Sequence, residues 1–442
     1  MAVPPLAFFR RPVVAALTFQ GMSLFVGVAS VPLLLFFLSN DDFLAWILIS
    51  TFGALTIQIE QGIQIVAARR LARLWHSANR VLFLEELELI RGTYRKFALS
   101  VFFGLGSAGF LYFWLFAELS PSPIWPYAWV AFILSYGLNY LFGYNTVVLL
   151  ATENTVHLNL TSTLTRGINF VLTFYLLWQG LSILGLSLSF LASVGLSITL
   201  LRRRANEQIE KFSDRPPLHS QRETSVKRSD RAASTVANMA YTLSNFFLYK
   251  GAFLVFPLLP GASDISGYGL SLQLVAIVYA VSIIPTQVWL DRLVHAVLQG
   301  DVNRVRSNLL ISLAFGAVVF TAFFLAIVVL ARPALVLIGS DVELPSNALI
   351  GLIFLAFGIE SIIFMLVNLL LILEETRVLW RYIVGVWIAL TVSCATQIVA
   401  PAIGITTVFL LVPMLIQAFT TLPVVLWHAM ARVKALSGGL DG

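Results

Sequence analysis

The chain of 442 residues is 59% hydrophobic and only 11% charged, and its mean hydropathy is +0.89. A soluble domain carries about 25% charged residues, so this composition excludes a soluble enzyme or a soluble binding domain. The net charge of +6 follows from membrane topology and gives no reason to expect a nucleic-acid partner. With a single cysteine, the chain has no disulfide framework.

Apolar segments of about twenty residues recur along the whole chain, and each is long enough to cross a bilayer core of about 30 Å. Their length and the absence of strict polar–apolar alternation predict helices rather than barrel strands. We therefore predict an all-α polytopic membrane protein with about twelve spans. In chain order, these cover residues 13–38, 43–66, 96–116, 127–150, 158–178, 181–201, 234–258, 267–290, 308–330, 346–373, 380–400 and 404–427.

The longest polar stretch, residues 202–235, divides the spans into six and six. We predict an N-terminal six-helix lobe (1–201), a cytoplasmic linker (202–233) and a C-terminal six-helix lobe with a short cytoplasmic tail (234–442). The segments VPLLLFFLSNDDF and FPLLPGASDISGY end the first span of each half in a similar way. This echo favours two parallel repeats, a plan in which transporters place their site between the halves.

The distribution of basic residues predicts the orientation of the chain. With a cytoplasmic N-terminus, 25 of the 28 Lys and Arg residues fall on the cytoplasmic side, and only Arg332 falls outside. This asymmetry is a positive-inside signal, and it places both termini in the cytoplasm. Between spans 2 and 3, residues 67–95 place Leu71, Leu74 and Trp75 on one side of a helical wheel, which indicates an interfacial amphipathic helix.

Four ionisable residues lie inside the predicted spans: Glu60, Arg166, Lys250 and Glu360. A cation at the centre of a membrane helix costs roughly 2.5–3.5 kcal/mol on insertion scales, so such residues usually face protein or water and mark functional pathways. Two interpretations remain open. The charges either line an aqueous cavity, or they form static ion pairs, Glu60 with Arg166 and Lys250 with Glu360.

Polar residues form stripes on several spans. Span 5 has polar residues at steps of three and four, which place them on one face of a helix with Arg166: Asn159, Ser162, Asn169 and Thr173. Spans 1, 2 and 7 carry similar stripes. Stripes of this kind serve helix packing in many membrane proteins, but their number here predicts an aqueous or protein-lined cavity.

The sequence contains no Walker A motif, no dinucleotide-binding glycine motif, no Cys/His metal spacing and no long loop that could hold an active site. We therefore predict a transporter rather than an enzyme, with no catalytic residue, no metal ligand and no cofactor. An enzymatic alternative would need paired acids on an outer loop, for which the candidates are Asp41, Asp42, Asp341 and Glu343.

The chain resembles the polysaccharide and O-antigen flippases of the multidrug/oligosaccharidyl-lipid/polysaccharide (MOP) exporter superfamily. The resemblance covers residues 5–435 and rests on the six-plus-six layout, FLSNDDFLAW after span 1, IEQG late in span 2 and the arginine-rich linker. It implies two six-helix lobes in a V that opens alternately to each side. The implied substrate is an oligosaccharide on undecaprenyl pyrophosphate, moved to the outer leaflet of a bacterial inner membrane, and the implied partners are membrane lipids, a polysaccharide polymerase and chain-length proteins.

Under this resemblance, Arg166 and Lys250 are the expected contacts of the pyrophosphate, because Arg binds phosphate bidentately and Lys acts as a point charge. Glu60 and Glu360 are expected to hold these cations in the empty site, or to take up H⁺ or Na⁺. Seven further residues are expected to line the sugar cavity: Gln64, Tyr136, Asn139, Tyr140, Asn169, Asn245 and Tyr249.

Two other functions remain open. A cation-coupled multidrug exporter of the same superfamily would need an acidic, aromatic-lined cavity for organic cations, whereas Lys250 and Arg166 favour an anion. A membrane glycosyltransferase, polymerase or ligase would need catalytic acids on an outer loop.

Overall fold

The structure is a computed structural model of the chain, and it describes residues 5–77, 79–115, 123–213, 236, 239–251, 254, 265–284, 301–339, 344–372, 377–399 and 405–438. Within these ranges every regular element is helical. Eight of the described helices are long and apolar enough to cross a membrane. The predicted all-α membrane protein is thereby confirmed.

The chain forms two compact units, unit 1 from Met1 to Thr242 and unit 2 from Leu243 to Gly442. The predicted linker, 202–233, begins inside the last helix of unit 1, which continues to Ser213, and the rest of the linker lies outside the described residues. The elements of unit 1 are α1 (Pro5–Phe37), α2 (Asn40–His76), α3 (Arg80–Leu99), η1 (Ser100–Leu105), α4 (Gly106–Leu115), α5 (Trp125–Leu141), α6 (Tyr144–Ala151), α7 (Thr155–Trp178) and α8 (Ser182–Ser213).

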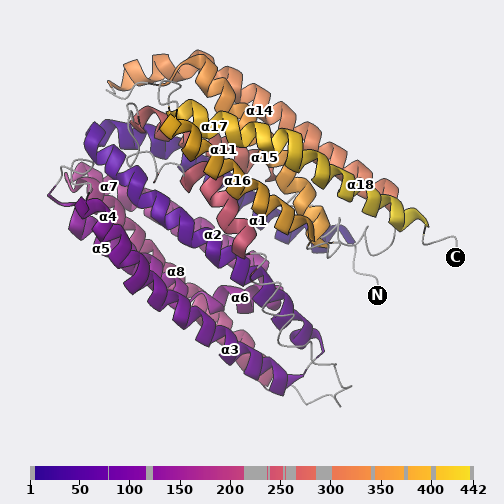
Figure 1. The fold of residues 1–442 in the computed structure, drawn as a ribbon. Helices are drawn as coiled ribbons and strands as arrows, with labels where there is room; N and C mark the ends of the chain where they lie inside the picture. Colours follow the sequence, from indigo (N-terminus) through magenta and orange to yellow (C-terminus); the bar gives the residue numbers. More distant parts are fainter. Residues whose placement is uncertain are drawn as a thin grey trace. The chain divides into compact units, whose positions relative to one another are not determined.

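In unit 1, α7 packs against both α1 and α8, and α5 packs along α8. Figure 1 shows α3, α5 and α8 side by side. The third predicted span is the continuous run from α3 through the π-helical η1 into α4, and the fourth is divided between α5 and α6. Each of the six spans predicted for the N-terminal half therefore corresponds to described helices.

The described elements of unit 2 are η3 (Phe247–Gly251), α11 (Ile265–Ser282), α14 (Val302–Ile338), α15 (Asn347–Ile372), α16 (Arg377–Val399), α17 (Ile405–Ile416), η6 (Gln417–Thr421) and α18 (Leu422–Gly438). Helix α15 is the centre of this unit, because it contacts α11, α14, α17 and α18. Gly339 ends α14 with φ 70°, a left-handed conformation that glycine adopts without strain.

The predicted loop after span 1 is very short, because α2 already begins at Asn40. Ser39 caps this helix and accepts a hydrogen bond from the backbone N–H of Asp42 at 3.2 Å. Asp41 and Asp42 lie in the first turn, where acidic side chains interact favourably with the helix dipole. Most of the acidic SNDD sequence therefore forms the first turn of α2.

The predicted interfacial helix over residues 67–95 is wrong. Helix α2 continues to His76, and a second helix, α3, begins at Arg80. The apolar side chains that indicated a membrane-surface helix pack on one another instead, and the Trp75 ring stacks on Phe212 of α8 with centroids 4.7 Å apart. The segment is amphipathic because it forms part of a helical hairpin with its own core.

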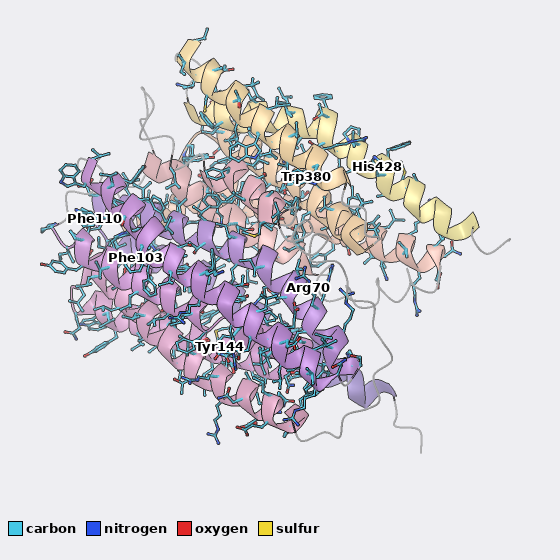
Figure 2. The ribbon with its side chains drawn as sticks, turned by 60° about the horizontal axis from the view of Figure 1, so that its bottom comes forward. Arg70, Phe103, Phe110, Tyr144, Trp380 and His428 are labelled. Atoms are coloured by element: carbon cyan, nitrogen blue, oxygen red, sulfur yellow. The ribbon has the colours of Figure 1, made fainter. Side chains whose placement is uncertain are left out.

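The interior of unit 1 near the start of α5 is built from aromatic rings. Trp129 is almost fully buried, and its indole N–H donates to the carbonyl oxygen of Gly106 at 2.9 Å. Its ring occupies the space where a side chain at Gly109 would lie, so α4 and α5 approach closely at this glycine. In contrast, the outward-facing side chains are largely apolar, as Figure 2 shows for Phe103 and Phe110. A surface of this kind suits contact with lipid.

Candidate functional site

Arg166 lies in the middle of α7 on the side that faces α1. Its guanidinium carbon lies 4.7 Å from the centroid of the Phe19 ring on α1, within the range of a cation–π interaction. The Arg166 side chain is exposed on unit 1, and the ion pairs among the described residues do not include it. One face of the guanidinium is thus covered by an aromatic ring, and its N–H donors lie in the guanidinium plane.

The other members of the polar stripe on α7 have different environments. Thr173 is buried, and its hydroxyl oxygen lies 2.8 Å from that of Ser189 on α8. The side-chain oxygen of Asn169, one turn after Arg166, is buried without a hydrogen-bond partner among the described residues. The stripe therefore serves helix packing at Thr173 and leaves polar groups unused around Arg166.

Glu60 lies on α2 beside the break between α5 and α6. Gly143 occupies this break, and a Cβ there would lie 3.1 Å from Oε1 of Glu60 and against the ring of Tyr94 on α3. Tyr136 and Tyr140 of α5 also lie within electrostatic range of the Glu60 carboxyl group. Glu60 is partly buried near three tyrosines, and it takes part in none of the ion pairs in the described part of the chain.

The tyrosines near Glu60 belong to the interior of unit 1. Tyr140 is fully buried, and its hydroxyl donates to Oγ1 of Thr56 on α2 at 2.7 Å. Tyr136 is buried against Phe132 and Phe190. Both were predicted to contact sugar, and the structure places both in packed positions.

Two buried polar atoms close to this break have no hydrogen-bond partner among the described residues: the hydroxyl of Tyr94 and Oδ1 of Asn145. An unsatisfied buried polar group costs about 1–3 kcal/mol. Two other predicted cavity residues, Gln64 and Asn139, are partly buried, and their side chains make no hydrogen bond within the described ranges. This part of unit 1 therefore contains several hydrogen-bonding groups that no described residue uses.

Lys250 lies in η3, a π-helical turn of unit 2. Turns of this type occur frequently at functional sites. The turn packs against α16, where the rings of Phe247 and Trp387 lie 5.5 Å apart between centroids. Lys250 is partly buried and forms no ion pair with a described side chain. The side chain of Tyr249, a predicted sugar contact, lies outside the described residues.

Glu360 of α15 is 1% exposed and accepts hydrogen bonds from neutral side chains of three other segments. Nδ2 of Asn245 donates to Oε1 at 2.8 Å, and Nε2 of Gln417 donates to Oε2 at 3.0 Å. The hydroxyl of Tyr382 on α16 lies 3.3 and 3.4 Å from the two oxygens. The predicted residues Asn245 and Glu360 therefore lie together at the centre of unit 2.

Neither of the two ion pairs considered from the sequence is present among the described side chains. Arg166 contacts Phe19 instead of Glu60, and Lys250 is not within ion-pair distance of Glu360. The two cations are accordingly not neutralised by the two acids that the sequence offered as partners.

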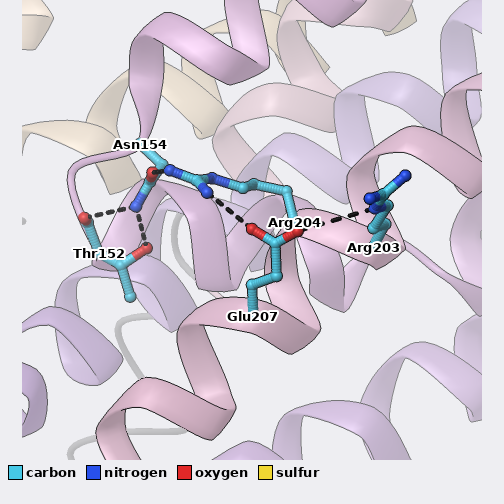
Figure 3. A network of polar contacts seen from close by, with 5 residues as sticks. All are labelled: Thr152, Asn154, Arg203, Arg204 and Glu207. Atoms are coloured by element: carbon cyan, nitrogen blue, oxygen red, sulfur yellow. Dashed lines mark hydrogen bonds and ion pairs between the residues drawn. The ribbon is translucent and has the colours of Figure 1, made fainter.

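A separate polar network connects α8 to the segment between α6 and α7 in unit 1, as Figure 3 shows. Arg204 of α8 donates to Oδ1 of Asn154 at 3.3 Å and to Oε2 of Glu207 at 2.7 Å. The amide of Asn154 donates in turn to the carbonyl and the hydroxyl oxygen of Thr152. Its members bond to one another, so this network fixes the α6–α7 connection.

Three residues near the buried acids were not predicted from the sequence, which contained only weak signals for them. Gln417 stands alone as an amide late in the last predicted span, and Tyr382 lies near the start of the span predicted at 380–400. Tyr94 fell in the segment that was predicted to lie on the membrane surface. No group of three His, Cys, Asp or Glu residues that could hold a metal ion occurs in the described parts of the chain.

No protein-family model and no curated protein matches the sequence. Solved structures match over nearly the whole chain. An inward-facing multidrug resistance MATE family transporter of the MOP superfamily matches with a TM-score of 0.67 at 12% identity, over 96% of this chain and 99% of that one. The MATE multidrug transporter DinF-BH matches with a TM-score of 0.61 at 14% identity, over 98% of this chain and 97% of that one.

A third match is a MOP superfamily transporter from Pyrococcus furiosus, with a TM-score of 0.57 at 13% identity over 97% and 96% of the two chains. That transporter is described as having a binding pocket of reverse polarity, which suggests a different function for it. At these identities the likeness shows the fold alone. The chain is an all-helical membrane protein with the twelve-helix fold of MATE-like MOP transporters.

Proposed function

We propose that this chain, which has the fold of MOP superfamily transporters, is a flippase for a lipid-linked oligosaccharide. The observation that supports this most directly is the environment of its two intramembrane cations. Arg166 and Lys250 form no ion pair with any described side chain. A cation costs roughly 2.5–3.5 kcal/mol within a membrane span, so an anionic substrate that passes the site would account for both.

The geometry at Arg166 suits a phosphate group. The Phe19 ring covers one face of the guanidinium and orients it. The five N–H donors lie in the guanidinium plane, where they can bind two phosphate oxygens in parallel. A pyrophosphate carries several such oxygens. Lys250 would add a second point charge from unit 2 at another stage of transport.

Sugar hydroxyl groups need hydrogen-bonding partners that the protein does not use itself. Asn169 lies one turn from Arg166 and has a buried side-chain oxygen without a described partner. Gln64 and Asn139 also make no internal side-chain hydrogen bond within the described ranges. These amides support a glycan next to the phosphate, whereas Tyr136 and Tyr140 contribute to packing.

Coupling to H⁺ or Na⁺ belongs to the same proposal and rests on Glu60. Its carboxylate and the ring of Tyr94 both border Gly143 in the interior of unit 1, and the buried hydroxyl of Tyr94 has no hydrogen-bond partner among the described residues. Asn145 adds an unpartnered oxygen close to the same helix break. Oxygen ligands of this kind suit a proton or a hard cation, and occupation of this site would also relieve the cost of the unsatisfied groups.

The second candidate is a cation-coupled multidrug exporter, which the buried acid Glu360 and the MATE structural matches favour. An organic cation would need an acid to face it. In the structure, however, the Glu360 carboxylate is already bound by Asn245, Tyr382 and Gln417. The unpaired cations favour the anionic substrate.

The cellular setting of the proposed flippase follows from its substrate. We propose a bacterial inner membrane with both termini in the cytoplasm, an undecaprenyl-pyrophosphate carrier, and a polysaccharide polymerase with its chain-length proteins as partners. Depletion of the protein tests the proposal directly. We expect lipid-linked repeat units to accumulate on the cytoplasmic leaflet and surface polysaccharide to fall. Unchanged polysaccharide together with increased sensitivity to cationic dyes would instead establish the multidrug exporter.

A further inference from the structure

Helix α16 bears an apolar groove on the surface of unit 2. The groove has a volume of about 400 Å³ and runs from Trp380 to Val392. Six of its seven lining residues are apolar, and Thr391 is the exception, whose hydroxyl donates to the carbonyl oxygen of Trp387 on the same helix. Apart from the indole N–H groups of its two tryptophans, the lining therefore offers van der Waals contact.

The length of the groove corresponds to one leaflet of a bilayer. From Trp380 to Val392 the helix rises by about 18 Å at 1.5 Å per residue, and half of a hydrocarbon core is about 15 Å thick. An acyl chain of a phospholipid fills such a groove from the interface to the midplane. A polyprenyl chain of many isoprene units is far longer than the groove.

A cationic group lies at one end of this groove. Arg381 follows Trp380 directly, and its Nη1 lies 3.1 Å from Nε2 of His428 on α18. Figure 2 shows Trp380 and His428 on these neighbouring helices. Arg381 belongs to none of the ion pairs formed by described side chains. His428 thus lies beside the guanidinium of Arg381, and the described side chains provide no counter-ion for its charge.

Exposed tryptophans mark the same level of the membrane. Trp380 on α16 and Trp427 on α18 are 48% and 62% exposed. Tryptophan is enriched where a span meets the headgroups, because its ring is apolar and its N–H is polar. Arg381 and His428, each adjacent in sequence to one of these tryptophans, therefore lie at headgroup depth.

We propose that this surface binds one anionic phospholipid of the leaflet that the charge distribution predicts to be cytoplasmic. Its phosphate accepts hydrogen bonds from Arg381 beside His428, and one acyl chain lies in the groove from Trp380 to Val392. Arginine binds phosphate through parallel N–H donors, and basic sites between helices on the cytoplasmic side bind anionic headgroups. This site is independent of the proposed transport substrate.

The position of the groove gives the lipid a structural role. Trp387 lines the groove and also contacts Phe247 of η3, the turn that holds Lys250. A chain seated against Trp387 supports this aromatic contact from the lipid side. Occupancy of the groove is therefore expected to stabilise η3.

Native mass spectrometry of the full-length protein tests the proposal. The protein is incubated in mild detergent with phosphatidylglycerol or with phosphatidylcholine of the same acyl chains. We expect one retained phosphatidylglycerol, favoured over phosphatidylcholine by about fivefold. Arg381→Gln removes the charge and should abolish the preference for phosphatidylglycerol. Ile388→Trp fills the groove and should abolish retention of the lipid. Both positions are exposed, and the thermal midpoint of each variant verifies its folding; Val392→Trp repeats the groove test at a second position.

Arg304→Gln provides the matched control, since Arg304 is an exposed arginine at the start of α14, away from the groove. It should retain the lipid as the wild type does. Equal retention of phosphatidylcholine, unchanged retention in Arg381→Gln, or an equal loss in Arg304→Gln would overturn the proposal. Preferential retention of undecaprenyl phosphate over phosphatidylglycerol would also overturn it, because the occupant would then be the carrier lipid.

Discussion

Gln417 donates a hydrogen bond from Nε2 to Oε2 of Glu360 at 3.0 Å in the buried centre of unit 2. Gln417 is the first residue of the π-helical η6, four residues after Pro413. A π-helical turn changes the rotation of the residues that follow it. With the bonds from Asn245 and Tyr382, this hydrogen bond links three other segments of unit 2 to the carboxylate on α15.

We expect Gln417→Ala to destabilise unit 2, because it removes a donor to a buried carboxylate. Loss of one hydrogen-bond partner in a buried site costs about 1–3 kcal/mol, which should lower the thermal midpoint in detergent. Glu360→Leu removes the acceptor, and the double variant should lose less than the sum of the two single effects, because both act on one interaction.

Gln397 on α16 is the control for this measurement. It is fully buried, and neither its amide nitrogen nor its oxygen has a hydrogen-bond partner among the described residues. Gln397→Leu should therefore be neutral or stabilising. Additive effects of Gln417→Ala and Glu360→Leu would show that their hydrogen bond contributes nothing measurable.

Gly143→Ala should destabilise unit 1. A Cβ at this position would contact the Tyr94 ring and lie 3.1 Å from Oε1 of Glu60. Overpacking of this kind costs about 1–3 kcal/mol. Gly92 of α3 has open space around it, and Gly92→Ala should stabilise that helix by about 0.5–1 kcal/mol. The thermal midpoints of the two variants should move in opposite directions, and a parallel shift would contradict the close approach at Gly143.

The helical class could be predicted from the sequence because it depends on a local property. Each span is a run of apolar residues long enough for the bilayer. The same reasoning failed for residues 67–95, because an amphipathic pattern is compatible with two different structures. Apolar residues such as Leu71 and Phe83 can face lipid headgroups or one another, and only the approach of α8 with Phe212 decides between them.

The candidate site shows a similar division. Intramembrane charges are visible in a sequence as exceptions, so Arg166, Lys250, Glu60 and Glu360 could be singled out. Their partners could not, because Phe19, Tyr382 and Gln417 reach the charges only through tertiary packing.

The two ends of α2 should lie on opposite sides of the membrane. Asp41 and Ser77 are separated by 36 residues, which is about 54 Å along a helix. In a Cys394→Ala background, a cysteine at Asp41 should react with an impermeant thiol reagent in intact cells, and one at Ser77 should react only after permeabilisation. The reverse pattern would overturn the predicted cytoplasmic orientation of the termini.

Arg166 should contribute to transport through its charge. We expect Arg166→Lys to retain part of the export activity and Arg166→Ala to lose it at normal abundance. Phe19→Leu removes a cation–π contact worth about 0.5–1 kcal/mol, so export should fall by about two- to fivefold. Polysaccharide export normalised to protein level is the measurement. Recovery of activity in Arg166→Ala/Glu60→Ala would contradict the substrate role, since it would identify Glu60 as the partner of Arg166.

Lys250→Met tests the second cation with nearly unchanged side-chain length. The variant loses a charge whose insertion costs roughly 3 kcal/mol, so it should insert and fold at least as well as the wild type. Export should nevertheless fall by about tenfold or more, because each 1.4 kcal/mol of lost phosphate binding is a factor of ten. Lys211→Met, at the exposed end of α8, should leave export unchanged. Normal export by Lys250→Met at equal abundance would exclude Lys250 from the substrate path.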